Sequence, residues 1–140
     1  MEINEISGAI IKAAIEVHRH LGPGLLESAY EACLCQELKL NGISVERQLD
    51  LPVEYKGIKL NCGYRMDLVV EKQVIVEVKA VEKILPIFEA QVLTYLKLTG
   101  LKLGLLINFN SPVVSRSIRR IVLGLSEVGE LLVEEEQKNE

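Results

Sequence analysis

The sequence predicts one mixed α/β domain in which helices cover a β-sheet and the elements follow the order ααβββαβα. Three observations predict this class. Apolar residues recur at three- and four-residue steps over residues 4–20, the spacing of an amphipathic helix. Between residues 43 and 81 the pattern changes to short runs rich in Val and Ile, separated by turn residues, as in strands. A helical stretch and a further apolar run follow, so a crossover helix joins three strands to a fourth.

The two N-terminal helices are bounded by turn residues. The first covers residues 4–20 and stops at the Gly-Pro-Gly run of residues 22–24. The second runs over about residues 25–40, and the Asn-Gly pair at 41–42 suits a left-handed cap. Both helices have an apolar stripe that can cover a sheet.

Three strands are expected next. The first covers residues 45–55, although Pro52 indicates that part of it lies at an edge or bulge. The second covers about residues 59–70 and the third residues 74–80. The chain then places Pro86 at the start of a helix that Gly100 closes. A buried strand over residues 103–109 and a last helix over residues 115–125 complete the expected order.

Length and composition limit the class of protein. With 140 residues, the chain is expected to fold as a single domain over residues 1–125. No apolar run approaches the roughly 20 residues of a membrane-spanning helix, so no membrane partner is expected. The N-terminus lacks the basic start of a secretory signal, and three cysteines are an odd number for a disulfide framework. A cytoplasmic protein with reduced thiols is therefore expected.

Charge is unevenly distributed. The net charge is −4, but residues 126–140 contain six Glu and one Lys and are expected to form a flexible acidic tail. The remaining 125 residues have a net charge of +1. A nearly neutral body neither requires nor excludes a nucleic-acid partner.

The two predicted strands around residues 71–73 place two acidic residues opposite each other. If residues 71–73 form the hairpin loop, Val70 faces Val74, and Asp67 faces Glu77 on the alternate face. The opposite face is wholly apolar, so burial specifies this register. The side chains expected on that apolar face are Val70, Val74, Leu68, Val76, Met66 and Val78.

Facing carboxylates destabilise a sheet unless something compensates for their charge. A hard divalent cation such as Mg²⁺ or Mn²⁺ would do so, because such ions take oxygen ligands and need only one or two protein carboxylates. Lys79 follows Glu77 by two residues and shares its face, where it could assist a water or stabilise charge on a phosphate. A purely structural alternative carries equal weight on strand geometry alone. In it, Arg65 and Lys79 neutralise Asp67 and Glu77 in an ion-pair cluster without catalysis.

Several motifs resemble a known family. The chain resembles the GxxExxY family of the PD-(D/E)xK nuclease superfamily, on its RecB-like side, over about residues 4–125. The motifs are Gly24-Leu25-Leu26-Glu27-Ser28-Ala29-Tyr30, Gly63-Tyr64-Arg65-Met66-Asp67 with Glu77-Val78-Lys79, and Gln91-Val92-Leu93-Thr94-Tyr95. This resemblance implies a restriction-endonuclease-like mixed sheet flanked by helices.

The resemblance also implies roles for individual residues. A Mg²⁺ or Mn²⁺ ion would be held by Asp67, Glu77, Glu27, the backbone carbonyl of Val78 and, by a loose alignment, His18. Lys79 would be the catalytic lysine. Substrate or site support would come from Gln91, Tyr95, Tyr30 and Arg65.

Each of these residues also has an ordinary structural interpretation. Glu27 could be an acidic first-turn residue favoured by the helix dipole, and Gln91 with Tyr95 a polar helix pair beside the core. Phe88 stands where related sequences tend to have His, which leaves a supporting role there open. The four cysteines of iron–sulfur RecB-like nucleases are not present, so no cluster is expected.

Three functional hypotheses follow. The first is a Mg²⁺- or Mn²⁺-dependent nuclease acting on DNA or RNA. The second is a catalytically weak or inactive nuclease-fold module that binds nucleic acid or a protein partner. The third is an ion-pair scaffold with no site. A chain this small offers little surface to hold a duplex, which makes a homodimer plausible.

Overall fold

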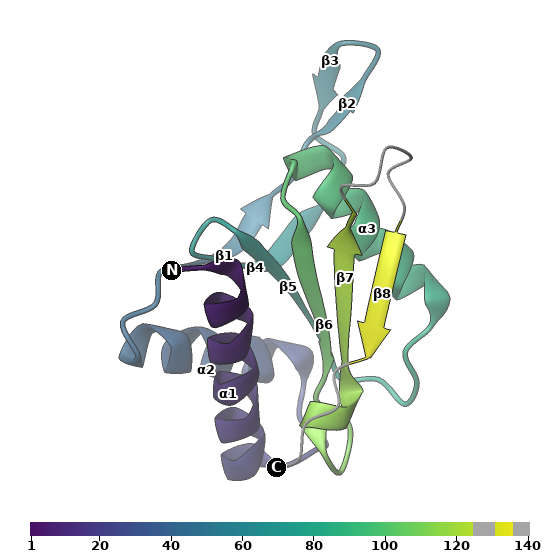
Figure 1. Cartoon of the computed structure of the whole chain (residues 1–140). Coiled ribbons are helices and arrows are strands. Elements are labelled where there is room, and N and C mark those ends of the chain that lie inside the picture. The colour runs from purple at the N-terminus through teal and green to yellow at the C-terminus, as the bar shows by residue number, and fades with distance from the viewer. Residues whose placement is uncertain (125–130, 136–140) are drawn as a thin grey trace.

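The computed structural model describes the backbone of residues 1–124 and 131–135 and the side chains of residues 1–124. A six-stranded mixed sheet has two helices on one face and a third helix on the other (Figure 1). The helices are α1 (Ile3–Leu21), α2 (Glu27–Leu40) and α3 (Pro86–Thr99). The expected fold class, a restriction-endonuclease-like mixed sheet flanked by helices, is confirmed.

The sheet has the strand order β1-β4-β5-β6-β7-β8. Only the central pair, β5 and β6, is parallel, because α3 connects these strands as a crossover helix. The strands are β1 (Val45–Asp50), β2 (Val53–Tyr55), β3 (Ile58–Leu60), β4 (Arg65–Val70), β5 (Val74–Lys79), β6 (Leu103–Asn108), β7 (Ile118–Leu123) and β8 (Leu131–Glu135).

The two long strands expected over residues 45–55 and 59–70 are each broken. β1 ends at Asp50 and β4 begins at Arg65, and these two strands pair with each other. The chain between them forms the separate β2–β3 hairpin, which projects beyond the sheet at the top of Figure 1. Pro52 lies at the break, where its missing N–H cannot serve a ladder.

The expected helix over residues 115–125 is wrong. A short 3₁₀-helix, Val114–Ser117, leads into β7 instead. The segment Ile118-Arg119-Arg120-Ile121-Val122-Leu123 is rich in β-branched residues, and β7 is paired on both sides, with β6 and β8. Pairing with strands on both sides therefore decided the structure of this segment.

The expected acidic tail, residues 126–140, differs in part from the structure. Residues 131–135 form β8, the edge strand of the sheet. Residues 126–130 and 136–140 lie outside the described residues. Among the described helices, none combines the length and apolarity needed to cross a membrane.

Two apolar layers enclose the sheet. The first lies between the sheet and the helices α1 and α2, and includes Leu68, Val76 and Val78. The second lies between the sheet and α3, and includes Val69, Ile75 and Tyr95. The middle strands β5 and β6 are buried over nearly their whole length, so any polar side chain there needs a specific partner.

Candidate active site

The hairpin of β4 and β5 keeps the predicted register over the three residue pairs nearest its turn. Beyond them the ladder does not continue to Asp67 and Glu77. The N–H of Val78 donates to Asp67 Oδ2 at 2.8 Å, and the N–H of Asp67 donates to Glu77 Oε1 at 3.2 Å. The two carboxyl groups therefore take the place of backbone acceptors between the strands, and each lies against the other residue's strand.

The alternation of β4 side chains between the two faces of the sheet is interrupted near Asp67. Met66, expected on the face that α1 and α2 cover, packs instead in the α3 layer. Gln48 of β1 lies opposite Asp67, because its neighbours Arg47 and Leu49 pair with Leu68 and Met66. Gln48 has a left-handed φ of 54°, so the backbone of β1 departs from extended geometry beside Asp67, while the register on both sides of Gln48 stays the same.

Glu77 is buried, with 4% of its surface exposed. Burial raises its pKa to about 9, and the charge of Asp67 and a hydrogen bond between the two side chains add to the shift. A proton therefore holds the pair together at neutral pH when no metal is present. A divalent cation could replace that proton, because it is attracted to both carboxyl groups and prefers oxygen ligands. The donor set of Asp67 and Glu77 thus fits a Mg²⁺ or Mn²⁺ ion.

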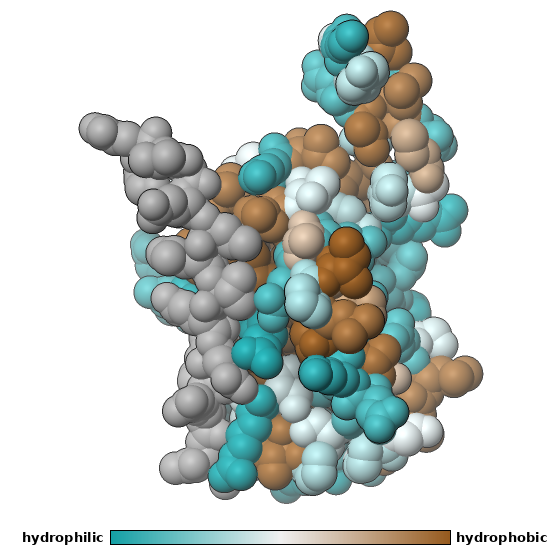
Figure 2. Space-filling model, turned by 90° about the vertical axis from the view of Figure 1, so that its right-hand side faces the viewer, coloured by the Kyte–Doolittle hydropathy of each residue, from teal (hydrophilic) through white to brown (hydrophobic). Residues whose placement is uncertain are grey.

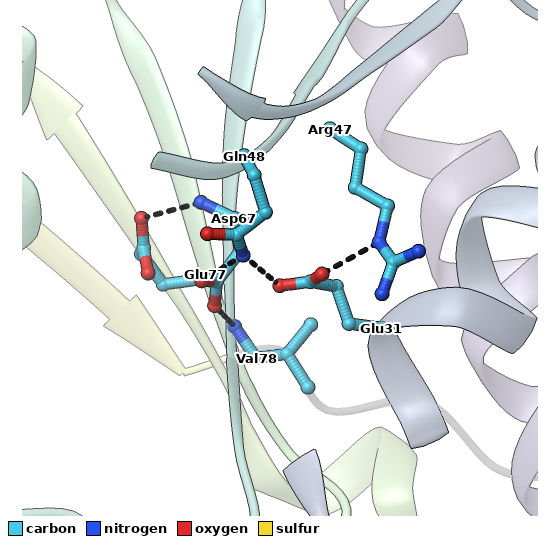
Figure 3. A network of polar contacts seen from close by, with 6 residues as sticks. All are labelled: Glu31, Arg47, Gln48, Asp67, Glu77 and Val78. Carbon is cyan, nitrogen blue, oxygen red and sulfur yellow. Dashed lines mark hydrogen bonds and ion pairs between the residues drawn. The ribbon is translucent and has the colours of Figure 1, made fainter. Parts of the chain in front are cut away.

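A third carboxyl group, Glu31 of α2, joins this network and was not singled out from the sequence. Its Oε2 accepts from Arg47 Nε and its Oε1 from Gln48 Nε2, both at 2.6 Å. The same Gln48 nitrogen lies 3.4 Å from Asp67 Oδ1, so Gln48 bridges the two acidic residues (Figure 3). Burial raises the pKa of Glu31, opposed by the Arg47 bond. The only sequence signal was its position one helical turn after Glu27.

Glu27 is tied to the end of β5. Its Oε2 accepts the N–H of Ala80, the residue after Lys79, at 3.1 Å. From the other side, the Asn108 side chain accepts the N–H of Val81 at 3.1 Å and donates to its carbonyl at 2.9 Å. Glu27 and Asn108 therefore fix the chain that immediately follows Lys79. Within the described part of the chain, no three His, Cys, Asp or Glu side chains gather as a metal-binding group, so Glu27 does not join the carboxyl pair.

Lys79 lies half-buried at the end of β5, and its charge lowers the pKa of Glu77. Its Nζ is 4.6 Å from the ring centroid of Phe88, a cation–π distance. Arg65 pairs with Asp50 across β1 and β4, with Nε 3.1 Å from Oδ1. In residues 1–124, neither cation forms a salt bridge with the acidic pair, so the ion-pair cluster does not form there.

Tyr95 and Gln91 of α3 lie side by side, as their four-residue spacing predicts. Gln91 Nε2 donates to the Tyr95 hydroxyl at 2.9 Å. Burial raises the pKa of Tyr95 to about 12, and the charges of Glu77 and Asp67 add to this shift. The hydroxyl therefore keeps its proton and can donate a hydrogen bond to an anionic ligand near the carboxyl pair.

Tyr30 is hydrogen-bonded to the loop between α1 and α2, and His18 to the chain after β6. The Tyr30 hydroxyl donates to the carbonyl of Gly22 at 2.5 Å and accepts the N–H of Leu25 at 3.1 Å. Its ring stacks on Phe109 with a centroid distance of 4.6 Å. His18 Nε2 donates to the Ser111 carbonyl at 2.7 Å. Both contacts are structural, and His18 belongs to no metal-binding group among the residues described.

A cleft of about 750 Å³ opens beside Lys79. It lies between the β2–β3 hairpin, the start of β4 and one side of α3. Its lining consists of Val53, Tyr64, Lys79, Ile87, Phe88, Ala90, Gln91, Thr94, Tyr95 and Leu98. Lys79 and Tyr95 are the residues that connect this cleft with the carboxyl pair.

Comparison with known proteins agrees with this geometry. A family model described as the PD-(D/E)XK nuclease superfamily matches residues 4–121, which include every candidate site residue. Proteins of this superfamily generally use divalent metal ions. No curated protein and no solved structure gives a significant match to the chain.

Proposed function

Because this chain belongs to the PD-(D/E)XK nuclease superfamily, we propose that it is a Mg²⁺- or Mn²⁺-dependent nuclease that hydrolyses phosphodiester bonds of DNA or RNA. The observation that carries the proposal is the buried Glu77 carboxyl group held against Asp67. Such a pair is costly in a sheet without a cation, and its raised pKa is typical of a functional site. The narrower assignment to the GxxExxY family remains a prediction.

Asp67 and Glu77 would hold the ion, together with the backbone carbonyl of Val78. When bound, the ion supplies a Lewis acid that stabilises negative charge on the phosphate. Gln48 positions Asp67 by donating to its Oδ1. Glu27 is assigned to positioning, because its hydrogen bond to Ala80 fixes the chain beside Lys79.

Lys79 supplies a cation, and Tyr95 a neutral hydrogen-bond donor, near the carboxyl pair. Lys79 orients a water molecule or stabilises the charge that develops on the phosphate oxygens. The Tyr95 hydroxyl donates a hydrogen bond to a non-bridging phosphate oxygen, and Gln91 fixes the orientation of that hydroxyl. These groups act by position and charge, which suits phosphoryl chemistry.

The test is a cleavage assay with purified protein, Mg²⁺ or Mn²⁺, and labelled single-stranded, duplex and branched DNA and RNA. Removing Asp67 (Asp67→Ala) or Lys79 (Lys79→Ala) should lower cleavage at least a hundredfold, as loss of a single charge-stabilising group does. Glu46→Gln and Lys102→Ala remove comparable charges from exposed positions away from the site and should cleave like wild type. Equal cleavage by wild type and the two site variants would indicate a contaminating nuclease and remove the proposal.

The structure also favours a second candidate function, a nuclease-fold module that binds nucleic acid without cutting it. Among the described residues only two carboxyl groups share the candidate metal site, which suits a weakly held ion. This alternative predicts nucleic-acid binding by wild type with no metal-dependent products. Accumulation of products that requires both Asp67 and Mn²⁺ would exclude it.

A further inference from the structure

The cleft beside Lys79 has the chemical character of a site for flat, uncharged groups. Three of its lining side chains are aromatic: Tyr64, Phe88 and Tyr95. The Tyr64 and Tyr95 rings meet edge to face, with centroids 6.4 Å apart and an interplanar angle of 65°. Most of the remaining lining is aliphatic, and its volume of about 750 Å³ lies in the range of sites for small organic ligands.

The hairpin and α3, which both contribute to the cleft lining, carry strongly exposed apolar side chains. Tyr55 and Ile58 on the hairpin, and Ile87 on α3, are all at least 60% exposed. Figure 2 faces the α3 side of the molecule and shows hydrophobic residues both on the projecting hairpin and on the middle of this face. Apolar surface gathered around a cleft marks a binding region rather than a solvated wall.

The charges near the cleft do not suit a duplex. Among the described residues that line the cleft, Lys79 alone is charged. Residues 1–125 contain 15 Lys and Arg against 14 Asp and Glu, so no strong positive field compensates elsewhere. Duplex binding depends on several phosphate contacts by Lys and Arg, and a duplex keeps its bases stacked inside.

We propose that this cleft binds unpaired nucleobases, so that the substrate is a single-stranded nucleic acid whose bases stack on Tyr64 and Phe88. This inference rests on the proposed nuclease function and names its substrate class. Aromatic side chains bind the faces of unpaired bases with little dependence on sequence. The phosphate next to such a base then lies by Lys79 and Tyr95. Both residues line the cleft, and both interact electrostatically with the carboxyl pair.

The test measures binding without turnover, by fluorescence anisotropy in EDTA. The probes are a labelled 12-mer of oligothymidylate, one of oligouridylate, a 12-base-pair duplex and an abasic 12-mer with the same phosphates but no bases. The pyrimidine single strands should bind at least tenfold more tightly than the duplex and the abasic strand. Their affinity should change little between 50 and 200 mM salt, because few phosphate contacts are made.

Variants locate the binding surface. Tyr64→Ala should weaken oligothymidylate binding by about fivefold or more, the loss expected for one stacking contact. Leu98→Ala removes an apolar side chain from the lining and should also weaken binding. Leu40→Ala removes an exposed leucine from α2, away from the cleft, and should bind like wild type. Far-UV circular dichroism and thermal melts check that each variant is folded.

Each contrary result has a definite meaning. Equal binding of the abasic strand, tighter binding of the duplex, no binding of any probe, or unchanged binding by Tyr64→Ala would overturn the proposal. A dimer that light scattering detects and Leu98→Ala dissociates would also overturn it, because a second copy would then cover the cleft. Metal-dependent cleavage together with unchanged binding by Tyr64→Ala would reject base binding in the cleft and leave the nuclease proposal standing. Base-dependent binding without any cleavage would reject the nuclease proposal and leave base binding in the cleft standing.

Discussion

Single residues determine the charge balance of the site, and Glu77 matters most among them. Its carboxyl group is buried in β5, hydrogen-bonded to the backbone and side chain of Asp67. In the metal-free protein this arrangement raises the pKa of Glu77 from 4.5 to about 9. The folded protein therefore binds a proton that the unfolded chain releases over a wide pH range, and this links stability to pH.

The first prediction concerns this linkage. The contribution of Glu77 to the stability of the metal-free protein is fully present below pH 4.5 and is lost as the pH rises toward about 9. Glu77→Gln keeps the hydrogen-bonding shape of the protonated group and cannot ionise. Urea unfolding in EDTA from pH 5 to 9 should therefore show a smaller fall in the free energy of unfolding for Glu77→Gln than for wild type. Glu46→Gln, at an exposed position on β1, is the control. Parallel pH profiles for wild type and Glu77→Gln would contradict the prediction.

The second prediction concerns Gln48, which combines a left-handed backbone with bonds to Glu31 and Asp67. Both Gln48→Ala and Gln48→Gly remove these bonds. Only Gln48→Gly also relieves the unfavourable φ of 54°, because glycine adopts positive φ readily. Chemical denaturation should find the glycine variant about 1 kcal/mol more stable than the alanine variant. If the alanine variant proves equally or more stable, the left-handed backbone at Gln48 is not strained.

The sequence alone predicted part of the site at this scale. Turn length and the apolar opposite face were enough to bring Asp67 beside Glu77, and helical spacing was enough to pair Gln91 with Tyr95. Glu31 could not be found in the same way, because its partners Arg47 and Gln48 come from a different element, and only the tertiary structure shows the left-handed backbone at Gln48. The exact role of Glu27 also depended on a long-range contact, its bond to the N–H of Ala80.

At the scale of elements, the close approach of α3 to β6 supports the α3 side of the site. Gly104 permits this approach, because a Cβ at that position would lie 2.4 Å from Val92 Cγ1. Val92 is fully buried and β-branched, so it has little freedom to move away. The same helix presents Gln91 and Tyr95, which makes its position relative to the sheet functionally relevant.

The third prediction tests this contact. Gly104→Ala should lower the free energy of unfolding by about 1–3 kcal/mol, the usual cost of overpacking a core. Gly8→Ala is the matched control, because Gly8 lies within α1 with open space around it and should gain about 0.5–1 kcal/mol from helix propensity. Urea denaturation of both variants measures the difference. A neutral Gly104→Ala variant would mean that α3 can shift without cost.

Elements were predicted well where one local pattern dominated. The helices α1, α2 and α3 followed from apolar spacing and from their Pro and Gly boundaries. The β7 segment was predicted as part of a helix over residues 115–125 that follows Ser111-Pro112. Arg119 instead lies 3.8 Å from Glu89 of α3, and Arg120 bonds to Ser7 and Asn4 of α1. These partners are distant in the sequence, so no local pattern could reveal them.

At the scale of the whole molecule, the sheet separates the layer covered by α1 and α2 from the α3 side, where the cleft lies. The layer beneath α1 and α2 is apolar and includes the motif residue Tyr30, while the exposed Glu27 at the start of α2 bonds to the N–H of Ala80. The other side carries α3, and the β2–β3 hairpin projects beyond the sheet (Figure 1). The cleft is lined by residues of α3, by Val53 of the hairpin and by Lys79 at the end of the central strand β5. The two sides meet at Asp67, which Gln48 connects to Glu31 of α2. The nuclease proposal therefore depends on whether a cation binds at this junction.

Isothermal titration calorimetry with Mn²⁺ at pH 7, in two buffers of different ionisation enthalpy, tests this claim most directly. Wild type should bind one Mn²⁺ and release about one proton per ion, because the cation displaces the proton that Glu77 holds. Glu77→Gln should lose at least tenfold in affinity and release no proton, whereas Glu46→Gln should match wild type. Absence of Mn²⁺ binding, or equal binding by wild type and Glu77→Gln, would contradict a metal site at Asp67 and Glu77.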